Sequence, residues 1–337
     1  MSADQPQGAD FGSGFGRDTP LDMISGFVAV IGRPNVGKST LVNRLVGTKV
    51  SIVSDKPQTT RTQIRGVLNR FDAQLVFVDT PGIHKPRTPL GNRLNDRAQA
   101  AASGVDLVCV VLDGASGVGR GDERVLRSAP ADAVVVLNKV DGMRPELVAA
   151  QLATAARFAA NTGAAASANI GGNIGGNVSG NVGGNTGGGM ASPQPDRREY
   201  FPVSAISGEG VSALLDHLLG RLPTGPAFFP RDEATDNPEA FWVAELVREQ
   251  LLARTEDELP HSIATRVTEW DWPYIRCEIL VERDSQKGIV IGHGGAVLKA
   301  VGSEVRKALA PGAYLELAVK VERNWQRRPA SLDRLGF

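Results

Sequence analysis

One eight-residue string, GRPNVGKS at residues 32–39, constrains the fold of this chain more than any other feature. It follows the β-branched run FVAVIG at residues 27–32 and precedes residues 38–46, where leucine and valine recur with helical spacing. Strand, glycine-rich turn and helix in this order form a phosphate loop, in which successive backbone N–H groups surround an anion. The string therefore predicts an α/β domain that binds a nucleotide.

The phosphate loop assigns a role to particular side chains. Lys38 is expected to reach the β- and γ-phosphates, and Ser39 is expected to bind Mg²⁺. The following helix adds its positive N-terminal end. The expected nucleotide contacts in this segment are Gly32, Asn35, Val36, Gly37, Lys38, Ser39 and Thr40.

A second string, DTPG at residues 79–82, closes another apolar strand. Asp79 is expected to hold magnesium through water, as the acidic residue of phosphate-loop NTPases does, and the Gly82 N–H to face the γ-phosphate. Between the two strings lies QTTR at residues 58–61. We favour Thr60 over Thr59 as a magnesium ligand present only with GTP, so that the loop is released when the γ-phosphate is lost. The predicted catalytic set is Lys38, Thr60, Asp79 and Gly82, and the predicted metal set is Ser39, Thr60 and Asp79.

Guanine selection is predicted by NKVD at residues 138–141, again just after an apolar strand. The Asp141 carboxylate accepts hydrogen bonds from N1 and N2 of guanine, a donor pair that adenine lacks. Asn138 is expected to contact N7 and brace the loop, and Lys139 to lie along the base. Farther on, Ser204, Ala205 and Ile206 (SAI) resemble the last guanine motif, in which the alanine N–H meets O6. The four strings, in the required order, predict GTP and GDP as ligands.

Hydrolysis is predicted to be slow in the isolated protein. Ras-type enzymes place a glutamine after the DxxG turn to orient water. Here that position is Ile83, which has no polar group. We expect a partner, a potassium ion or backbone groups to supply what this side chain does not.

Further apolar runs at residues 74–79, 107–113 and 133–138 alternate with helical stretches, which favours a mostly parallel sheet with helices on both faces. The pattern breaks at residues 161–195, where NIGGNIGGNVSGNVGGNTGGG predicts a flexible insertion, with a Gly/Asn solenoid as the alternative. We predict a disordered tail at 1–22, a GTPase domain at 23–222, a proline-rich linker at 223–238, a second domain at 239–325 and a C-terminal tail at 326–337.

The second domain reads α-β-β-α-α-β, the order of a type II KH domain. Its GHGG string, residues 292–295, is the G-x-x-G loop that clamps single-stranded RNA. The expected RNA contacts are Gly292, His293, Gly294, Gly295, Lys287 and Lys299. Lysines and arginines outnumber acidic residues across 285–328, which suits phosphate binding. Trp325 has two open roles, stacking on a base or packing in an interface.

The sequence resembles the Era family of bacterial GTPases. The matching strings are GRPNVGKSTLVNRLVG, KPQTTR, DTPGIHKP, NKVD, SAISGEG, REQLL, ELPHS and GIVIGHGGAVLK. The resemblance implies a Ras-like GTPase domain followed by a smaller KH domain, and a KH domain that binds the 3′ end of 16S rRNA. It also implies a role in assembly of the 30S ribosomal subunit and rRNA processing, with peripheral association with the cell membrane.

Three features depart from the family pattern: the Gly/Asn insertion, the N-terminal extension, and the lack of Lys or Arg between the outer glycines of GHGG. Two other functions stay open. One is a GTPase whose C-terminal module docks protein instead of RNA, and the other is a tRNA-modification GTPase, for whose chemistry we find no residues.

The composition of the chain favours a cytoplasmic protein. Formal net charge is +0, so any basic surface must be local. The two cysteines, Cys109 and Cys277, lie in separate apolar runs and are expected to be buried, as in a reducing cytosol. No apolar run approaches the length of a membrane span. We expect a monomeric cytoplasmic protein.

Overall fold

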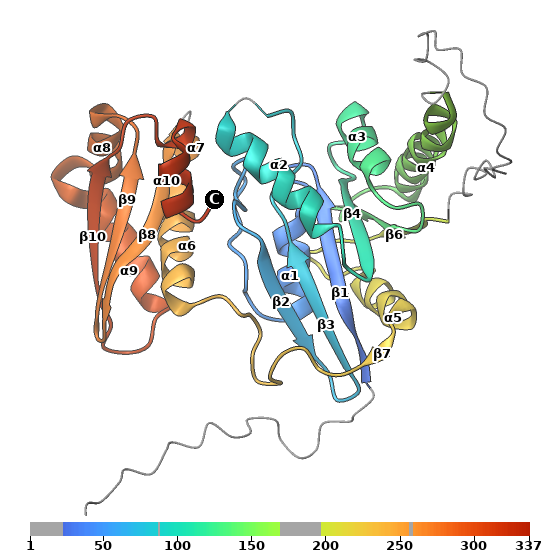
Figure 1. The fold of residues 1–337 in the computed structure, drawn as a ribbon, viewed down its shortest axis with the longest axis horizontal. Coiled ribbons are helices and arrows are strands. Elements are labelled where there is room, and N and C mark those ends of the chain that lie inside the picture. Colours follow the sequence, from blue (N-terminus) through green and yellow to red (C-terminus); the bar gives the residue numbers. More distant parts are fainter. Residues whose placement is uncertain (1–22, 87, 169–196, 256–258) are drawn as a thin grey trace, which may run out of the picture.

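The computed structural model describes residues 23–86, 88–168, 197–255 and 259–337, with side chains for all of these except 161–168. Figure 1 shows two bodies side by side, a larger one from the first two-thirds of the chain and a smaller one coloured orange to red. The two cysteines are buried, one in each body.

In the described residues the larger body is built on a seven-stranded sheet with the order β2-β3-β1-β4-β5-β6 and β7 paired to β1. Its strands are β1 (Met23–Gly32), β2 (Ile64–Asn69), β3 (Ala73–Asp79), β4 (Leu107–Asp113), β5 (Val134–Asn138), β6 (Glu199–Pro202) and β7 (Thr224–Gly225). β3, β1, β4, β5 and β6 run parallel, whereas β2 is antiparallel to β3. The predicted mostly parallel sheet is confirmed.

Helices cover both faces of this sheet, as the alternating pattern predicts. α1 (Lys38–Val46) and α5 (Val211–Arg221) bury their leucines and valines on one face. α2 (Pro89–Ala101), α3 (Arg120–Ser128) and α4 (Pro145–Ala168) pack on the other. Because the parallel strands end at one edge, the loops after β1, β3 and β5 meet there, and these loops carry the phosphate loop, DTPG and NKVD.

The expected start of the insertion needs correction. α4 continues to Ala168, so residues 161–168 are helical backbone instead of flexible chain. These residues, NTGAAASA, are alanine-rich and favour helix, whereas the glycine repeat begins only after them. The remainder of the predicted insertion, together with the predicted disordered tail at 1–22, lies outside the described residues.

The proline-rich segment 223–238 is not a free tether. Its strand β7 pairs with the start of β1, and Phe228 packs its ring against Phe27 at 4.8 Å. The side chain of Gln74 accepts the Phe228 and Phe229 N–H groups at 2.6 and 2.9 Å. The segment therefore crosses the sheet of the larger body before it enters the smaller one.

The smaller body confirms the KH order, with a four-residue helix and a 3₁₀ turn added. Its elements are α6 (Glu239–Leu252), α7 (Leu259–Ser262), β8 (Ala264–Asp271), β9 (Tyr274–Val281), α8 (Asp284–Ile291), a 3₁₀ turn (His293–Gly295), α9 (Ala296–Lys307) and β10 (Tyr314–Val321). Its described strands form a sheet of order β10-β9-β8, with β9 and β10 parallel. The buried side chains Ile275, Cys277 and Ile279 pack under the helices.

The segment after β10, expected to be a tail, forms α10 (Pro329–Arg334) and packs against the larger body, as Figure 1 shows beside α2. Arg93 on α2 donates to Asp333 (2.6 Å) and to the Phe337 carbonyl (2.8 Å). The Trp325 side chain is fully buried in an apolar cluster that includes Leu94 of α2. Trp325 therefore packs in the interface between the two bodies, which decides between its two open roles.

Candidate functional site: a nucleotide cavity joined to a KH domain

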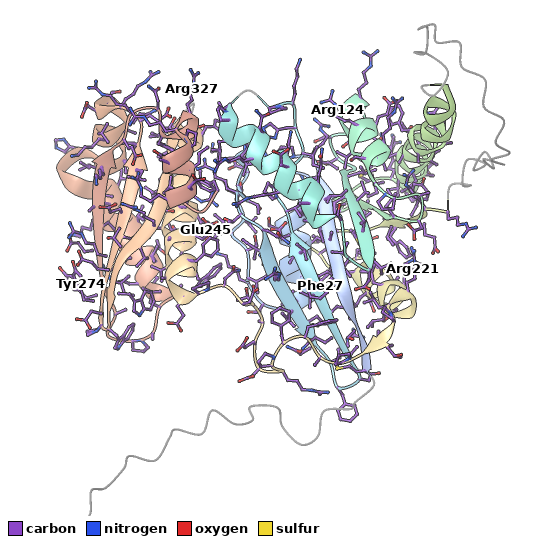
Figure 2. The ribbon with its side chains drawn as sticks, viewed as in Figure 1. Phe27, Arg124, Arg221, Glu245, Tyr274 and Arg327 are labelled. Atoms are coloured by element: carbon purple, nitrogen blue, oxygen red, sulfur yellow. The ribbon has the colours of Figure 1, made fainter. Side chains whose placement is uncertain are left out.

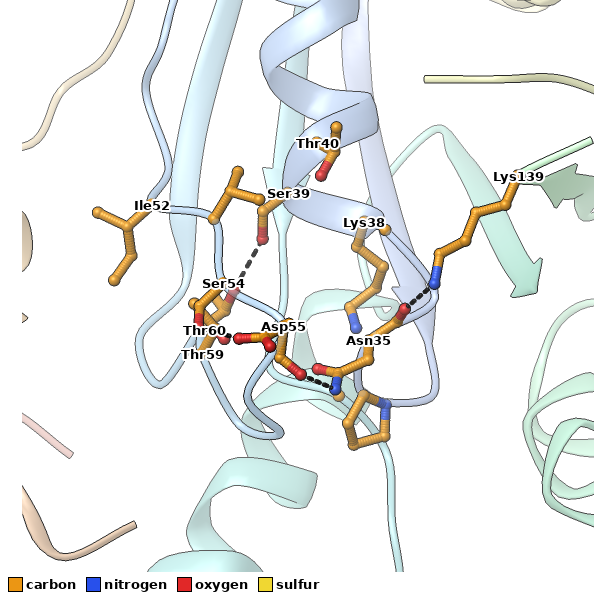
Figure 3. Close-up of a pocket in the computed structure, with 14 residues that line it drawn as sticks. Asn35, Lys38, Ser39, Thr40, Ile52, Ser54, Asp55, Thr59, Thr60 and Lys139 are labelled. Atoms are coloured by element: carbon orange, nitrogen blue, oxygen red, sulfur yellow. Dashed lines mark hydrogen bonds between the residues drawn. The ribbon is translucent and has the colours of Figure 1, made fainter. Parts of the chain in front are cut away.

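The phosphate loop turns around a cavity of about 350 Å³, which Figure 3 shows with its lining residues. Lys38 is buried, and its Nζ donates to the carbonyls of Gly32 (3.3 Å) and Arg33 (3.0 Å). Burial lowers the pKa of Lys38 to about 8, with Asp79 acting in the opposite direction. A desolvated ammonium beside a ring of backbone amides is a favourable site for a phosphate anion.

The three expected metal residues come together at one end of this cavity. Ser39 Oγ lies 2.8 Å from Thr60 Oγ1 and 2.6 Å from Asp79 Oδ2. Burial raises the pKa of Asp79, against the effect of Lys38 and of hydroxyl hydrogen bonds. The Asp79 Oδ1 atom is buried with no hydrogen-bond partner. A buried carboxylate with one unsatisfied oxygen beside two hydroxyls is a donor set suited to Mg²⁺ and its water.

The structure distinguishes the two candidate threonines. Thr60 is buried and faces Ser39, whereas Thr59 Oγ1 donates back to the Lys56 carbonyl of its own loop at 2.7 Å. Residues 54–62, here called the threonine loop, therefore close against Ser39 and Asp79 through Thr60.

The DTPG turn lies directly against the phosphate loop. A Cβ atom added to Gly82 would come within 2.6 Å of the Pro34 backbone nitrogen, so only glycine allows this approach. The next residue is turned away: the Ile83 side chain is buried in the core beneath α2 and α3. Its N–H donates to the Gly32 carbonyl at 3.0 Å. The expectation that residue 83 cannot orient water thus has a structural cause beyond its chemistry.

The guanine motifs also converge. Asn138 donates to the Val36 carbonyl (2.9 Å) and accepts the Ala205 N–H (3.0 Å), which ties the phosphate loop to the SAI segment. Ser204 Oγ donates to Asp141 Oδ1 at 2.7 Å and so orients that carboxylate. In this structure the Ala205 N–H, expected to meet O6 of guanine, is directed at Asn138.

The structure also places the remaining predicted nucleotide residues. Lys139 lines the cavity, and its Nζ donates to Asp113 Oδ2 (2.7 Å) and to the Asn35 carbonyl (2.6 Å). The Ile206 side chain is 74% exposed, and only its carbonyl is held, by Arg44 of α1. Thr40 lines the cavity from the first turn of α1.

Sequence motifs gave no sign of the role of Arg61. This residue follows Thr60, and its guanidinium enters the smaller body, where it donates to the carbonyls of Ile263 (2.5 Å), Pro260 (3.1 Å) and His261 (3.1 Å). It also lies 5.8 Å from the centre of the Trp325 ring. Burial, with the charge of Arg248, lowers the pKa of Arg61 to about 9, while Glu245 opposes this. Figure 2 shows Glu245 on the side of the smaller body that faces the larger one. Pro260 and His261 of α7, together with Ile263 directly after it, thus provide the carbonyls that bind the Arg61 guanidinium.

A second contact joins the same loop region to α6. Glu249 on α6 accepts the Val53 N–H at 2.9 Å and pairs with Lys49 at 2.6 Å. The KH body therefore contacts the chain on both sides of Thr60, at Arg61 within the threonine loop and at Val53 directly before it.

The GHGG loop lies between α8 and α9, away from this interface. His293 and Gly294 are exposed, as is Lys299 on α9, whereas Lys287 on α8 is half-buried. The Ile289 side chain on α8 is 57% exposed, an apolar surface beside the loop that the sequence reading did not single out.

Comparisons with known proteins agree with this geometry. A family model described as a 50S ribosome-binding GTPase matches residues 27–139, and the KH domain model matches residues 258–326. GTPase Era of Mycobacterium sp. strain KMS is 44% identical over 329 residues, covering 93% of this chain and 98% of that protein. The chain belongs to the Era family of GTPases. It follows that it is an enzyme that hydrolyses GTP.

Other Era proteins extend the match. GTPase Era of Mycobacterium tuberculosis strain ATCC 25177 / H37Ra is 41% identical over 330 residues, with 93% and 98% coverage. The structure of Era in complex with MgGDPNP and nucleotides 1506–1542 of 16S ribosomal RNA aligns with a TM-score of 0.77 at 32% identity, covering 93% of this chain and 99% of that one. A tyrosine-to-alanine variant of Aquifex aeolicus Era bound to GDP·AlF4⁻ aligns with a TM-score of 0.74 at 33% identity and the same coverage.

Proposed function

We propose that this chain is a GTP-dependent switch that binds 16S rRNA near its 3′ end and acts in 30S subunit assembly and rRNA processing. The observation that carries the proposal is Arg61: the residue after the metal-facing Thr60 is buried in the KH domain. A change in the threonine loop on hydrolysis would therefore alter the contacts that this loop makes with the RNA-binding domain. The solved Era complex with MgGDPNP and a 16S rRNA segment supports this assignment.

We propose that GTP and GDP bind with Mg²⁺ in the cavity of the phosphate loop. Ser39 and Thr60 would ligate the ion and Asp79 would hold its water, while Lys38 and the Gly82 N–H would contact the γ-phosphate. The ion supplies charge neutralisation for phosphoryl transfer. The other nucleotide contacts proposed from the sequence apply to the same cavity.

No helix in the described residues is long and apolar enough to cross a bilayer. We further propose that the protein acts in the cytoplasm as a monomer and that it contacts the membrane peripherally. These proposals rest on the sequence and on the family resemblance.

A potassium ion is our proposed aid to hydrolysis. Asn35 has a positive φ of 64°, and its Nδ2 donates to the Asp55 carbonyl of the threonine loop at 2.5 Å, a hydrogen bond drawn in Figure 3. The amide oxygen of Asn35 and the carbonyl oxygen of Asp55 are neutral oxygen ligands, the kind that replace the hydration shell of K⁺. These groups flank the cavity where the β- and γ-phosphates would lie.

GTP hydrolysis is expected to be several-fold faster in KCl than in NaCl at equal ionic strength. Asn35→Ala is expected to abolish that difference while leaving GDP affinity nearly unchanged. Phosphate release in the two salts, at fixed Mg²⁺, measures the effect. Equal rates in both salts for the wild-type protein would exclude a potassium role.

RNA binding is tested with a labelled oligonucleotide that matches the 3′ end of 16S rRNA, in the presence of GDP or a non-hydrolysable GTP analogue. Gly292 is a poor site for substitution, because an added Cβ would meet the Val297 backbone nitrogen at 2.9 Å. Gly294 and Gly295 have open space at that position. Gly294→Asp/Gly295→Asp, which adds two negative charges, is expected to weaken binding by about 10- to 100-fold.

The matched control is Gly312→Asp, in the α9–β10 loop. Gly312 also has a positive φ (93°) and open space, so its substitution likewise puts an aspartate in a left-handed conformation, with one added negative charge away from the GHGG loop. RNA affinity should stay within about twofold of wild type. If the wild-type protein does not bind the RNA in either nucleotide state, the C-terminal module is better described as a protein-docking domain.

A further inference from the structure

Two side chains next to the nucleotide cavity, Gln58 of QTTR and His84 after DTPG, form a contact that is not among the nucleotide and metal contacts assigned above. His84 Nε2 lies 2.8 Å from Gln58 Nε2, and His84 Nδ1 lies 3.0 Å from the Gly82 carbonyl. The carbonyl can only accept, so Nδ1 carries the proton and donates to it. The unprotonated Nε2 then accepts from the Gln58 amide. The imidazole thus joins the threonine loop to the DTPG turn.

Both residues are held in place by their surroundings. Asn95 on α2 clamps the His84 backbone, accepting its N–H (3.2 Å) and donating to its carbonyl (2.7 Å). Gln58 has a positive φ of 62°, a left-handed conformation that is unfavourable for a residue other than glycine. Residues held in such conformations tend to occur where position matters for function.

The Gln58–His84 pair lies close to the residues proposed to contact the metal and the γ-phosphate. Gln58 lies two residues before Thr60, and His84 two residues after Gly82. His84 lines a basin of about 400 Å³ with Arg33, Lys85 and Arg124, and this basin shares Pro34 and Asn35 with the nucleotide cavity. Ile83, which stands where a water-orienting glutamine is found in Ras, is buried in the core. The Gln58–His84 contact is therefore a second polar side-chain link between the threonine loop and the DTPG segment, beside the one from Thr60 Oγ1 to Asp79 Oδ2 (3.4 Å).

We propose that Gln58 and His84 are positioning residues for GTP hydrolysis. Their hydrogen bond keeps the threonine loop closed against the DTPG turn, so that Thr60 and the Gly82 N–H stay on the metal and γ-phosphate while water attacks. The proposal rests on the roles assigned above to Thr60 and Gly82. It predicts an effect on the hydrolytic step and little effect on nucleotide affinity, because Lys38, Asn138 and Asp141 carry the ground-state contacts.

The test compares single-turnover GTP hydrolysis in Gln58→Gly, His84→Ala and the double variant. Glycine is chosen at position 58 because it accepts the positive φ, so a slower rate cannot come from backbone strain. Each single variant is expected to be slower by about 10- to 100-fold, the usual result of a misplaced catalytic loop. The double variant is expected to be no slower than the slower single variant, since both remove one shared contact. Affinity for a fluorescent GDP should change by less than about twofold.

Lys85→Ala is the matched control, because Lys85 is exposed in the same basin and lies next to His84. It should hydrolyse GTP at the wild-type rate. Wild-type rates in Gln58→Gly and His84→Ala would overturn the proposal, and so would losses that multiply in the double variant. Thr60→Ala distinguishes failure of the assigned site from failure of the proposed Gln58–His84 pair. Normal hydrolysis in Thr60→Ala would refute the assigned site itself, whereas a slow Thr60→Ala with normal Gln58→Gly and His84→Ala would refute the proposed pair alone.

Discussion

Asp141→Asn is expected to lower the affinity for GTP by about 100- to 10,000-fold and to create affinity for xanthosine triphosphate. The carboxylate accepts two charge-assisted hydrogen bonds from guanine, each of which contributes about 1.5–3 kcal/mol. An asparagine keeps one acceptor and places an NH₂ donor against a guanine donor. Xanthine carries a carbonyl oxygen where guanine carries its amino group, so that donor is then satisfied.

The structure supports this prediction through the rigidity of the loop. Ser204 Oγ is 2.7 Å from Asp141 Oδ1, and Asn138 connects the loop to Val36 and Ala205. An asparagine at position 141 keeps the same shape and stays oriented by Ser204. The exchange should therefore change which base is bound without damaging the fold.

Titration calorimetry with GTP, xanthosine triphosphate and ATP measures the exchange. Asp132→Asn is a matched control, because Asp132 forms a surface ion pair with Arg221 and its side chain is 61% exposed. Such pairs contribute little, so nucleotide affinity should not change. Retention of wild-type GTP affinity by Asp141→Asn would remove the guanine role from Asp141 and require another residue to select the base.

The sequence allowed the fold and the composition of the nucleotide cavity to be predicted because these motifs act over short stretches of chain. GRPNVGKS, DTPG and NKVD each end a strand, and parallel strands bring their carboxyl ends to one edge. The approach of Ser39, Thr60 and Asp79 follows from that topology. The same holds for the α-β-β-α-α-β order of the KH domain, whose apolar runs and glycine turn are local signals.

What could not be predicted depends on contacts between distant residues. Arg61 and its partner carbonyl at Ile263 are 202 residues apart, and Arg93 and Phe337 are 244 apart. Neither pairing produces a periodicity or a motif in the sequence. The segments 223–238 and 326–337 were therefore expected to be loose, although each packs against the GTPase domain. Trp325 had two open roles for the same reason, since its burial depends on α2.

The limits of helix α4 illustrate a different difficulty. The glycine-rich repeat is obvious, but the predicted insertion started before it, at residues 161–168, which contain more alanine than glycine and extend the preceding helix. The boundary drawn at residue 161 is thus several residues too early, because helix propensity continues until the alanines end.

Arg61→Met is expected to make RNA affinity nearly independent of the bound nucleotide, whichever direction the wild-type difference takes. Methionine keeps apolar contact with Trp325 but leaves the carbonyls of Pro260, His261 and Ile263 without their cationic donor. Each unsatisfied buried carbonyl costs about 1–3 kcal/mol. Separation of the two domains restores water to these carbonyls, so the cost should appear as a weakened interface instead of global unfolding.

Thr60 is unchanged in Arg61→Met, and nucleotide affinity should therefore stay close to wild type. Two measurements address the domains directly: amide hydrogen exchange of α7, which should rise in the analogue-bound state, and the ratio of RNA affinities with GTP analogue and GDP, which should approach one. Arg65→Met is the matched control. Arg65 pairs at 2.5 Å with Asp236 at a partly exposed position of β2, and loss of that pair should leave the ratio unchanged. A wild-type ratio in Arg61→Met would show that the nucleotide signal reaches the KH domain by another route, for which the contact of Glu249 with Val53 is the next candidate.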